Sequence, residues 1–146
     1  MTDPVGDVLK AVRALSDSLD RMHGGMKDAM DMNASDLAAL RMLIVREHRG
    51  ESVSPHDLAR HLRISTASTT KLLDRLEASG HIERGPHPHD RRARVVTLTD
   101  ASRHEFIQYF GEHLGTMRDV AESYSAADLV TITRFLDDLG EALDPR

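Results

Sequence analysis

The chain has 146 residues, of which 40% are hydrophobic and 29% charged, and this is the composition of one ordinary globular domain. The absence of cysteine excludes disulfides, thiolate nucleophiles and cysteine-based zinc sites, and no apolar run approaches the ~20 residues that cross a membrane. The net charge of −5 argues against nucleic-acid binding by the whole surface. Because the N-terminus also lacks a signal-peptide pattern, we expect a cytoplasmic protein without a membrane partner.

The charge is unevenly distributed along the chain. Residues 60–94 contain eight basic and four acidic side chains, so this segment has a net charge of +4 and the remainder has −9. A basic centre between acidic flanks is typical of a local anion-binding face, although a solvated charged surface gives the same pattern.

Two amphipathic helices are predicted in the N-terminal part of the chain. Apolar residues recur at helical spacing from Val5 to Met22, and this pattern should end at Gly24 and Gly25. A second helix should begin after Asn33, whose side chain suits the N-cap position.

The segment from residue 54 to residue 80 predicts a helix-turn-helix. SPHDLARHL has a capping serine and a proline at the first helical position, and RIS is a short connection to the next helix, TASTTKLLDRLEASG. Gly80 should end that helix. Its inner face comprises Thr69, Leu72, Leu73 and Leu76, so its outer N-terminal face comprises Ser65, Thr66, Ala67, Ser68, Thr70 and Lys71.

The next segment predicts a β-hairpin. HIERG and ARVVTLT have strand composition, and the polar, proline-rich PHPHDRR between them should be a loop. A hairpin directly after a helix-turn-helix forms a winged helix, so the predicted fold is mainly α (α+β), with a two-stranded wing.

Two further helices are predicted after the wing, over residues 100–123 and from SAAD (125–128) towards the C-terminus. Their apolar stripes, like that of the first helix, are long for a chain whose central module has its own core. We therefore expect N- and C-terminal dimerisation helices and a homodimer, the alternative being that the stripes pack only on each other.

Two stretches match a known pattern. LARHLRISTASTTKLLDRLEASGHIER ends in Arg-Leu-Glu-x-x-Gly, and PHPHDRRARVVTLTDASR has Asp-x-Arg before a Val-rich strand and Leu-Thr. In this respect the chain resembles the MarR family of bacterial transcription regulators, from which Ser102 departs at a position that is often glycine. The resemblance implies one domain over 1–146, with a DNA-binding region at 33–99 and helical dimerisation regions at 5–24 and 100–146.

The resemblance also implies a function, that of a ligand-responsive repressor rather than an enzyme. It would bind a pseudo-palindromic operator in double-stranded DNA as a homodimer, without a cofactor. The outer face of the second helix of the helix-turn-helix would enter the major groove, with Lys71 and Arg75 at the phosphates. Ser65 has capping of the helix as its alternative role.

The wing would contact the minor groove. Arg92 is expected in the groove, with Arg91 and Arg94 beside it, and Asp90 would hold the wing by pairing with an arginine. The remaining wing residues expected near the DNA are His87 and His89.

Other functions are also compatible with the sequence. One is a winged helix used only for protein–protein contact. Another is a metal-dependent hydrolase that uses His87, His89 and Asp90, because HPHD resembles part of a His-x-His-x-Asp-His run. Arg92 replaces its final histidine, however, and three arginines would repel a cation. A zinc site on the following helix would use His104, Glu105 or His113.

The family resemblance implies a small aromatic or amphiphilic effector. Five of the seven methionines lie between residues 22 and 42, and flexible methionines suit an adaptable pocket. The predicted pocket residues are Met26, Met30 and Met42, and ordinary core packing is the alternative.

Overall fold

The computed structural model describes residues 2–144, which contain six helices and one two-stranded sheet. The first residue and the last two residues of the predicted 1–146 domain lie outside this range. The described residues form two compact units, one that ends at Phe106 and one that begins at Ile107. The predicted class, a mainly α fold with a two-stranded wing, is confirmed.

Helix α1 (Pro4–Ala29) is longer than predicted. It continues through Gly24 and Gly25, so the predicted end of the first helix at these glycines is wrong. A glycine inside a helix costs roughly 1 kcal/mol relative to alanine. The C-terminal turn, however, buries Met26, and Met30 is buried directly after it. This burial of apolar surface offsets the cost and extends the helix.

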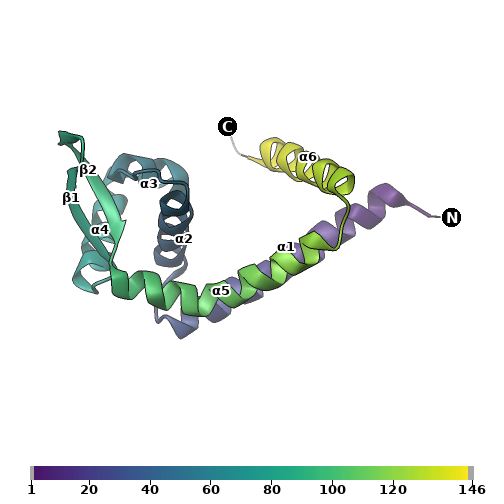
Figure 1. The fold of residues 1–146 in the computed structure, drawn as a ribbon, viewed down its shortest axis with the longest axis horizontal. Coiled ribbons are helices and arrows are strands. Elements are labelled where there is room, and N and C mark those ends of the chain that lie inside the picture. Colours follow the sequence, from purple (N-terminus) through teal and green to yellow (C-terminus); the bar gives the residue numbers. More distant parts are fainter. Residues whose placement is uncertain (1, 145–146) are drawn as a thin grey trace. The chain divides into compact units, whose positions relative to one another are not determined.

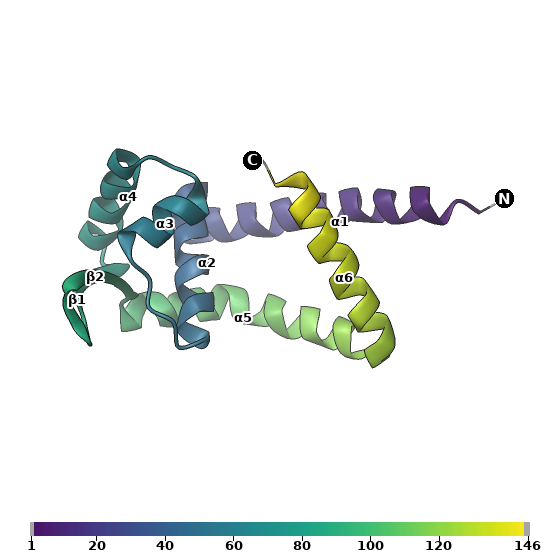
Figure 2. The same ribbon diagram turned by 90° about the horizontal axis from the view of Figure 1, so that it is seen from above.

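The helix-turn-helix lies where the sequence predicts it. Helix α2 (Ala34–His48) precedes α3 (Pro55–Leu62) and α4 (Thr66–Ala78), and α3 packs against α4 (Figures 1 and 2). Arg63 makes the turn between α3 and α4 in the left-handed conformation, with φ 56°. The side chains of Asn33, Ser54 and Ser65 cap α2, α3 and α4.

The wing consists of β1 (Ile82–His87) and β2 (Asp90–Leu98), which pair antiparallel. Pairing is regular from Ile82↔Leu98 to Pro86↔Arg94 and then shifts, so that His87 pairs with Asp90. Most of the predicted loop is therefore strand, and only Pro88 and His89 lie between the strands. The shift leaves residues 91–93 in a bulge, a feature that redirects side chains at the end of a ladder.

The core of the first unit is mostly aliphatic. The predicted inner face of α4 is buried in full, and α4 packs against α3, β1 and α2. The first turns of α5 (Asp100–Glu122) add the buried Phe106 to the same unit. The largest fully buried side chains of the first unit include Leu37, Leu40, Leu58, Leu73, Leu76, Ile82 and Phe106. This core fixes the position of α4 relative to the wing.

The second unit comprises the remainder of α5 and α6 (Ala126–Leu143), which Ser125 caps as predicted. None of its described residues, 107–144, is buried. Large apolar side chains are exposed along both helices, including Leu114, Met117, Val120, Val130 and Leu136. Within residues 2–144, no helix has the length and apolar character required to cross a bilayer.

Candidate nucleic-acid interface

The N-terminal half of α4 presents short polar side chains to solvent. Ser65, Thr66, Ala67, Ser68, Thr70 and Lys71 are all exposed. The Thr70 hydroxyl donates to the Thr66 carbonyl at 3.0 Å, which leaves its oxygen able to accept. Ser65 caps the helix by accepting from the Ser68 amide at 3.1 Å, so capping is one role of this residue. No acidic side chain occurs in the first turn of α4.

Three elements meet beside this face. A hollow of about 340 Å³ is lined by α3 through His56, by α4 through Thr66 and Thr70, and by the wing through Arg94. The structure thus brings Arg94 to α4 rather than to the wing tip. His56 was not predicted as a site residue. The available signal was its position. His56 lies in the first turn of α3, and the first helix of a helix-turn-helix crosses the DNA backbone.

An ion-pair cluster holds the wing against the other end of α4. The guanidinium of Arg84 on β1 donates to Asp74 at 2.7 Å and to Glu77 at 2.9 Å. The hydrogen bond with Glu77, and then that with Asp74, raises the pKa of Arg84, and the bond from Arg84 lowers the pKa of Glu77. Because Arg84 compensates both carboxylates, the acidic half of α4 is less repulsive to a nearby phosphate.

Arg75 has a partner that was not predicted from the sequence. Its Nη2 lies 2.6 Å from Oδ1 of Asp36 on α2, and its Nε donates to the same carboxylate at 3.2 Å. The Asp36 side chain is only 7% exposed. We therefore revise the predicted phosphate contact of Arg75, because its guanidinium anchors α4 to α2.

At the wing tip, Asp90 has a different partner from the one predicted for it. Its Oδ1 accepts from the backbone amide of Arg92 at 3.0 Å, whereas pairing with an arginine side chain was predicted. The turn is closed further by the His89 amide, which donates to Nδ1 of His87 at 3.0 Å. Arg91 and Arg92 are therefore held in the bulge with both side chains exposed.

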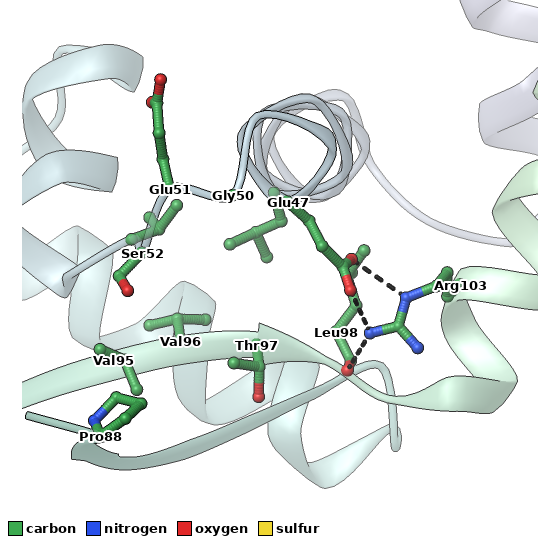
Figure 3. A pocket seen from close by; sticks show the side chains of 12 residues that line it. Glu47, Gly50, Glu51, Ser52, Pro88, Val95, Val96, Thr97, Leu98 and Arg103 are labelled. Atoms are coloured by element: carbon green, nitrogen blue, oxygen red, sulfur yellow. Dashed lines mark hydrogen bonds and ion pairs between the residues drawn. The ribbon is translucent and has the colours of Figure 1, made fainter.

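Arg103 joins the base of the wing to α2 and α5. Its guanidinium donates to the carboxylate of Glu47 at 3.0 Å, to Asp100 at 2.6 Å and to the Leu98 carbonyl at 3.3 Å. Figure 3 shows this guanidinium between Glu47 and the end of β2, at the rim of a hollow of about 230 Å³. The neighbouring Ser102 is buried, and its hydroxyl has no hydrogen-bond partner in the described chain.

The remaining predicted sites are not assembled in the structure. Residues 2–144 contain no group of three or more histidine, aspartate or glutamate side chains that could hold a metal ion, so neither the wing run nor the α5 histidines form a described metal site. Met26, Met30 and Met42 are 3%, 5% and 7% exposed and belong to the core. This favours core packing, although Met42 also borders a hollow beside α3.

Comparison with known proteins gives consistent matches. Residues 30–93 match the model of the MarR family. The chain is 30% identical over 122 residues to the uncharacterized HTH-type transcriptional regulator YfiV of Bacillus subtilis, a match that covers 83% of this chain and 74% of YfiV. It is 39% identical over 71 residues to the transcriptional activatory protein BadR of Rhodopseudomonas palustris, covering 43% of this chain and 41% of BadR. The match thus spans less than half of BadR.

The fold also matches solved structures. A mutant of S. aureus MepR bound to an oligodeoxyribonucleotide superposes with a TM-score of 0.60 over 94% of this chain and 98% of that chain, at 16% identity. At this level of identity the likeness concerns the fold.

Proposed function

Because the chain belongs to the MarR family of transcriptional regulators, we propose that it binds a pseudo-palindromic operator in double-stranded DNA as a homodimer and represses transcription there. The observation that carries the proposal is the convergence of His56, the exposed hydroxyls of α4 and Arg94 around one hollow. Hydroxyl and guanidinium donors of this kind bind phosphate oxygens and base edges.

In this proposal α4 enters the major groove with its N-terminal turns leading. Ser68 and Thr70 supply hydroxyls for phosphates or bases, and the Ala67 methyl suits a thymine methyl. Lys71 contacts the backbone. Arg75 holds α4 in place through Asp36 instead of touching DNA.

The wing lies in the adjacent minor groove. Arg92 is its leading side chain, because the bulge exposes it and Asp90 fixes its backbone. A narrow minor groove has an enhanced negative potential that attracts arginine. Arg91 and the two wing histidines, His87 and His89, lie beside the groove.

Dimerisation is supported by the apolar surface of the terminal helices. The second unit buries none of its described residues, and Val120, Val130 and Leu143 are each more than half exposed. Val5 on α1 is likewise exposed. Exposed apolar surface of this extent marks an interaction site, and a second copy of the chain provides a complementary surface by two-fold symmetry.

Repression would follow from occupation of promoter DNA by the dimer, and a small aromatic or amphiphilic effector would release it by favouring a DNA-incompetent spacing of the two α4 helices. Because BadR is named as an activatory protein, a reporter assay is needed to distinguish repression from activation by this chain. A reporter fused to the selected operator should be less active in the presence of the protein.

The first experiment is selection of genomic DNA fragments by the purified protein at ~150 mM salt, followed by a salt titration of the selected site. Four basic side chains of the interface have no carboxylate partner among the described residues, namely Lys71, Arg91, Arg92 and Arg94. Eight such charges in a dimer predict a slope of log K against log salt of about −7.

Two results would overturn the proposal. One is the absence of any enriched fragment with two-fold symmetry. The other is binding whose affinity does not depend on salt, because the phosphate contacts assigned to these side chains would then not exist. Retained binding of a protein partner by a variant that has lost DNA binding would favour the protein–protein alternative.

A further inference from the structure

The C-terminal part of α1 is joined to α2 by a contact between two basic side chains. Nη1 of Arg41 on α2 lies 2.6 Å from Nε2 and 3.2 Å from Nδ1 of His23 on α1. A guanidinium has donors and no acceptor, so the imidazole must accept this hydrogen bond. Because only the neutral form of histidine has an unprotonated ring nitrogen, the contact requires a neutral His23.

The charge of Arg41 has little other compensation. Arg41 forms no ion pair with a carboxylate among residues 2–144, and its buried Nε has no hydrogen-bond partner there. Burial lowers the pKa of Arg41, whereas hydrogen bonds with carboxylates raise the pKa values of Arg75 and Arg103. A guanidinium stays protonated near neutral pH, so Arg41 keeps a poorly compensated positive charge beside His23.

The surroundings of His23 contain more positive than negative charge. A hollow of about 280 Å³ between α1 and α2 is lined by His23 together with Asp20 and Lys27 of α1 and Arg41 of α2. Among the described residues of this lining, Asp20 is the only carboxylate. Protonation of His23 would therefore set three cations against one carboxylate.

The titration of His23 is shifted in the direction that this arrangement requires. Burial, and then the charge of Arg41, lowers the pKa of His23, and the charge of Asp20 opposes them. The unfolded chain, in which the pKa of histidine is about 6.5, therefore binds this proton more readily than the folded chain. By linkage, the stabilisation is complete above a pH of about 6.5 and is lost as pH falls from there through the folded pKa.

We propose that His23 and Arg41 form an acid-sensitive joint between α1 and α2, which is closed while the imidazole is neutral and opens when it is protonated. Protonation removes the acceptor that lies 2.6 Å from the guanidinium and puts a second cation in its place. Met26, one turn further along α1, is buried in the core, so the opening affects the part of α1 that precedes it. A partly exposed histidine without this role would give stability no such pH dependence. The inference concerns the free protein and does not depend on DNA binding.

The test compares thermal unfolding of the full chain at a pH of about 7.5 and about 5.5 in the wild type, His23→Gln and His104→Gln. Glutamine at position 23 offers Arg41 an uncharged acceptor at both pH values. The fall in Tm between the two pH values should be about 4 °C smaller in His23→Gln than in the wild type, the worth of one hydrogen bond. His104 is exposed on α5, so its variant should behave as the wild type does. An equal fall in all three proteins, or an equally reduced fall in both variants, would overturn the proposal.

Proton NMR of the His23 imidazole tests the pair without relying on unfolding. The midpoint of its titration should lie below about 6.5 in the wild type, and Arg41→Gln should raise it because a neighbouring cation is removed. Protection of the α1 amides before Met26 against hydrogen exchange should fall on acidification in the wild type and persist in His23→Gln. An unchanged midpoint in Arg41→Gln, or equal protection at both pH values in the wild type, would refute the joint. DNA binding is measured separately on the selected fragment, so its failure would refute the proposed function alone.

Discussion

Replacement of Arg75 by methionine tests whether α4 is anchored to α2 by an ion pair. Methionine keeps much of the apolar stem of arginine but has no donor, so Asp36 loses its hydrogen bonds from Nε and Nη2 at 3.2 and 2.6 Å. The Asp36 carboxylate is nearly buried, and water therefore replaces these bonds poorly. The variant leaves a buried charge without its partner.

The expected loss in the free energy of unfolding is about 2 kcal/mol. Removal of one partner from a buried ion pair costs about 3–5 kcal/mol. Arg75, however, is 49% exposed, so solvent screens the pair, and the lower range of about 1.5–3 kcal/mol for a hydrogen bond to a charged group applies. For a chain of this size, about 2 kcal/mol corresponds to a decrease in Tm of about 8 °C.

Urea unfolding followed by far-UV circular dichroism measures this loss, since the chain contains no tryptophan. Addition of Asp36→Asn to Arg75→Met should recover part of the loss, because a neutral amide leaves no unpaired charge. The salt dependence of DNA binding by the folded variant should equal that of the wild type. An unchanged free energy of unfolding together with a smaller salt slope would refute the reasoning and restore Arg75 as a phosphate ligand.

Three further predictions concern the wing, the α3 cap and the start of α5. Arg92→Ala should reduce the salt slope of DNA binding by about 2 in the dimer without lowering Tm, and an unchanged slope would remove Arg92 from the interface. The hydrogen bond from the Ser54 amide, the largest effect, lowers the pKa of Asp57. The stabilisation that this bond gives is therefore present above the unfolded pKa of about 3.9 and is lost as pH falls through the folded pKa. In urea unfolding at pH 5 and pH 3, the free energy of unfolding of Asp57→Asn should change less between the two pH values than that of the wild type. Ser102→Ala should raise the free energy of unfolding by about 1 kcal/mol because it removes an unsatisfied buried hydroxyl, and a loss of stability would show that this hydroxyl has a partner.

Features that depend on near neighbours in the chain were predictable from the sequence. The caps of α2, α3, α4 and α6 join residues three apart, and the inner face of α4 follows from its 3.6-residue period. Predictions of element length were less accurate. The first helix passes two glycines because tertiary burial of Met26 outweighs their local preference. The wing strands extend into a polar, proline-rich segment because the ladder pairs it.

The candidate site could not be predicted in the same way, because it depends on pairs of residues that are distant in the sequence. Arg75 meets Asp36 across 39 residues, and Arg103 meets Glu47 across 56. Arg75 and Arg84 contribute to the positive charge of residues 60–94, yet both are engaged in ion pairs within the protein. The charge that the proposal assigns to DNA is therefore smaller than the segment contains, and it comes from Lys71 on α4 and from Arg91, Arg92 and Arg94 of the wing. In the proposed function, the pairing of each charge within the fold, rather than the local density of charge in the sequence, decides which basic side chains remain for DNA.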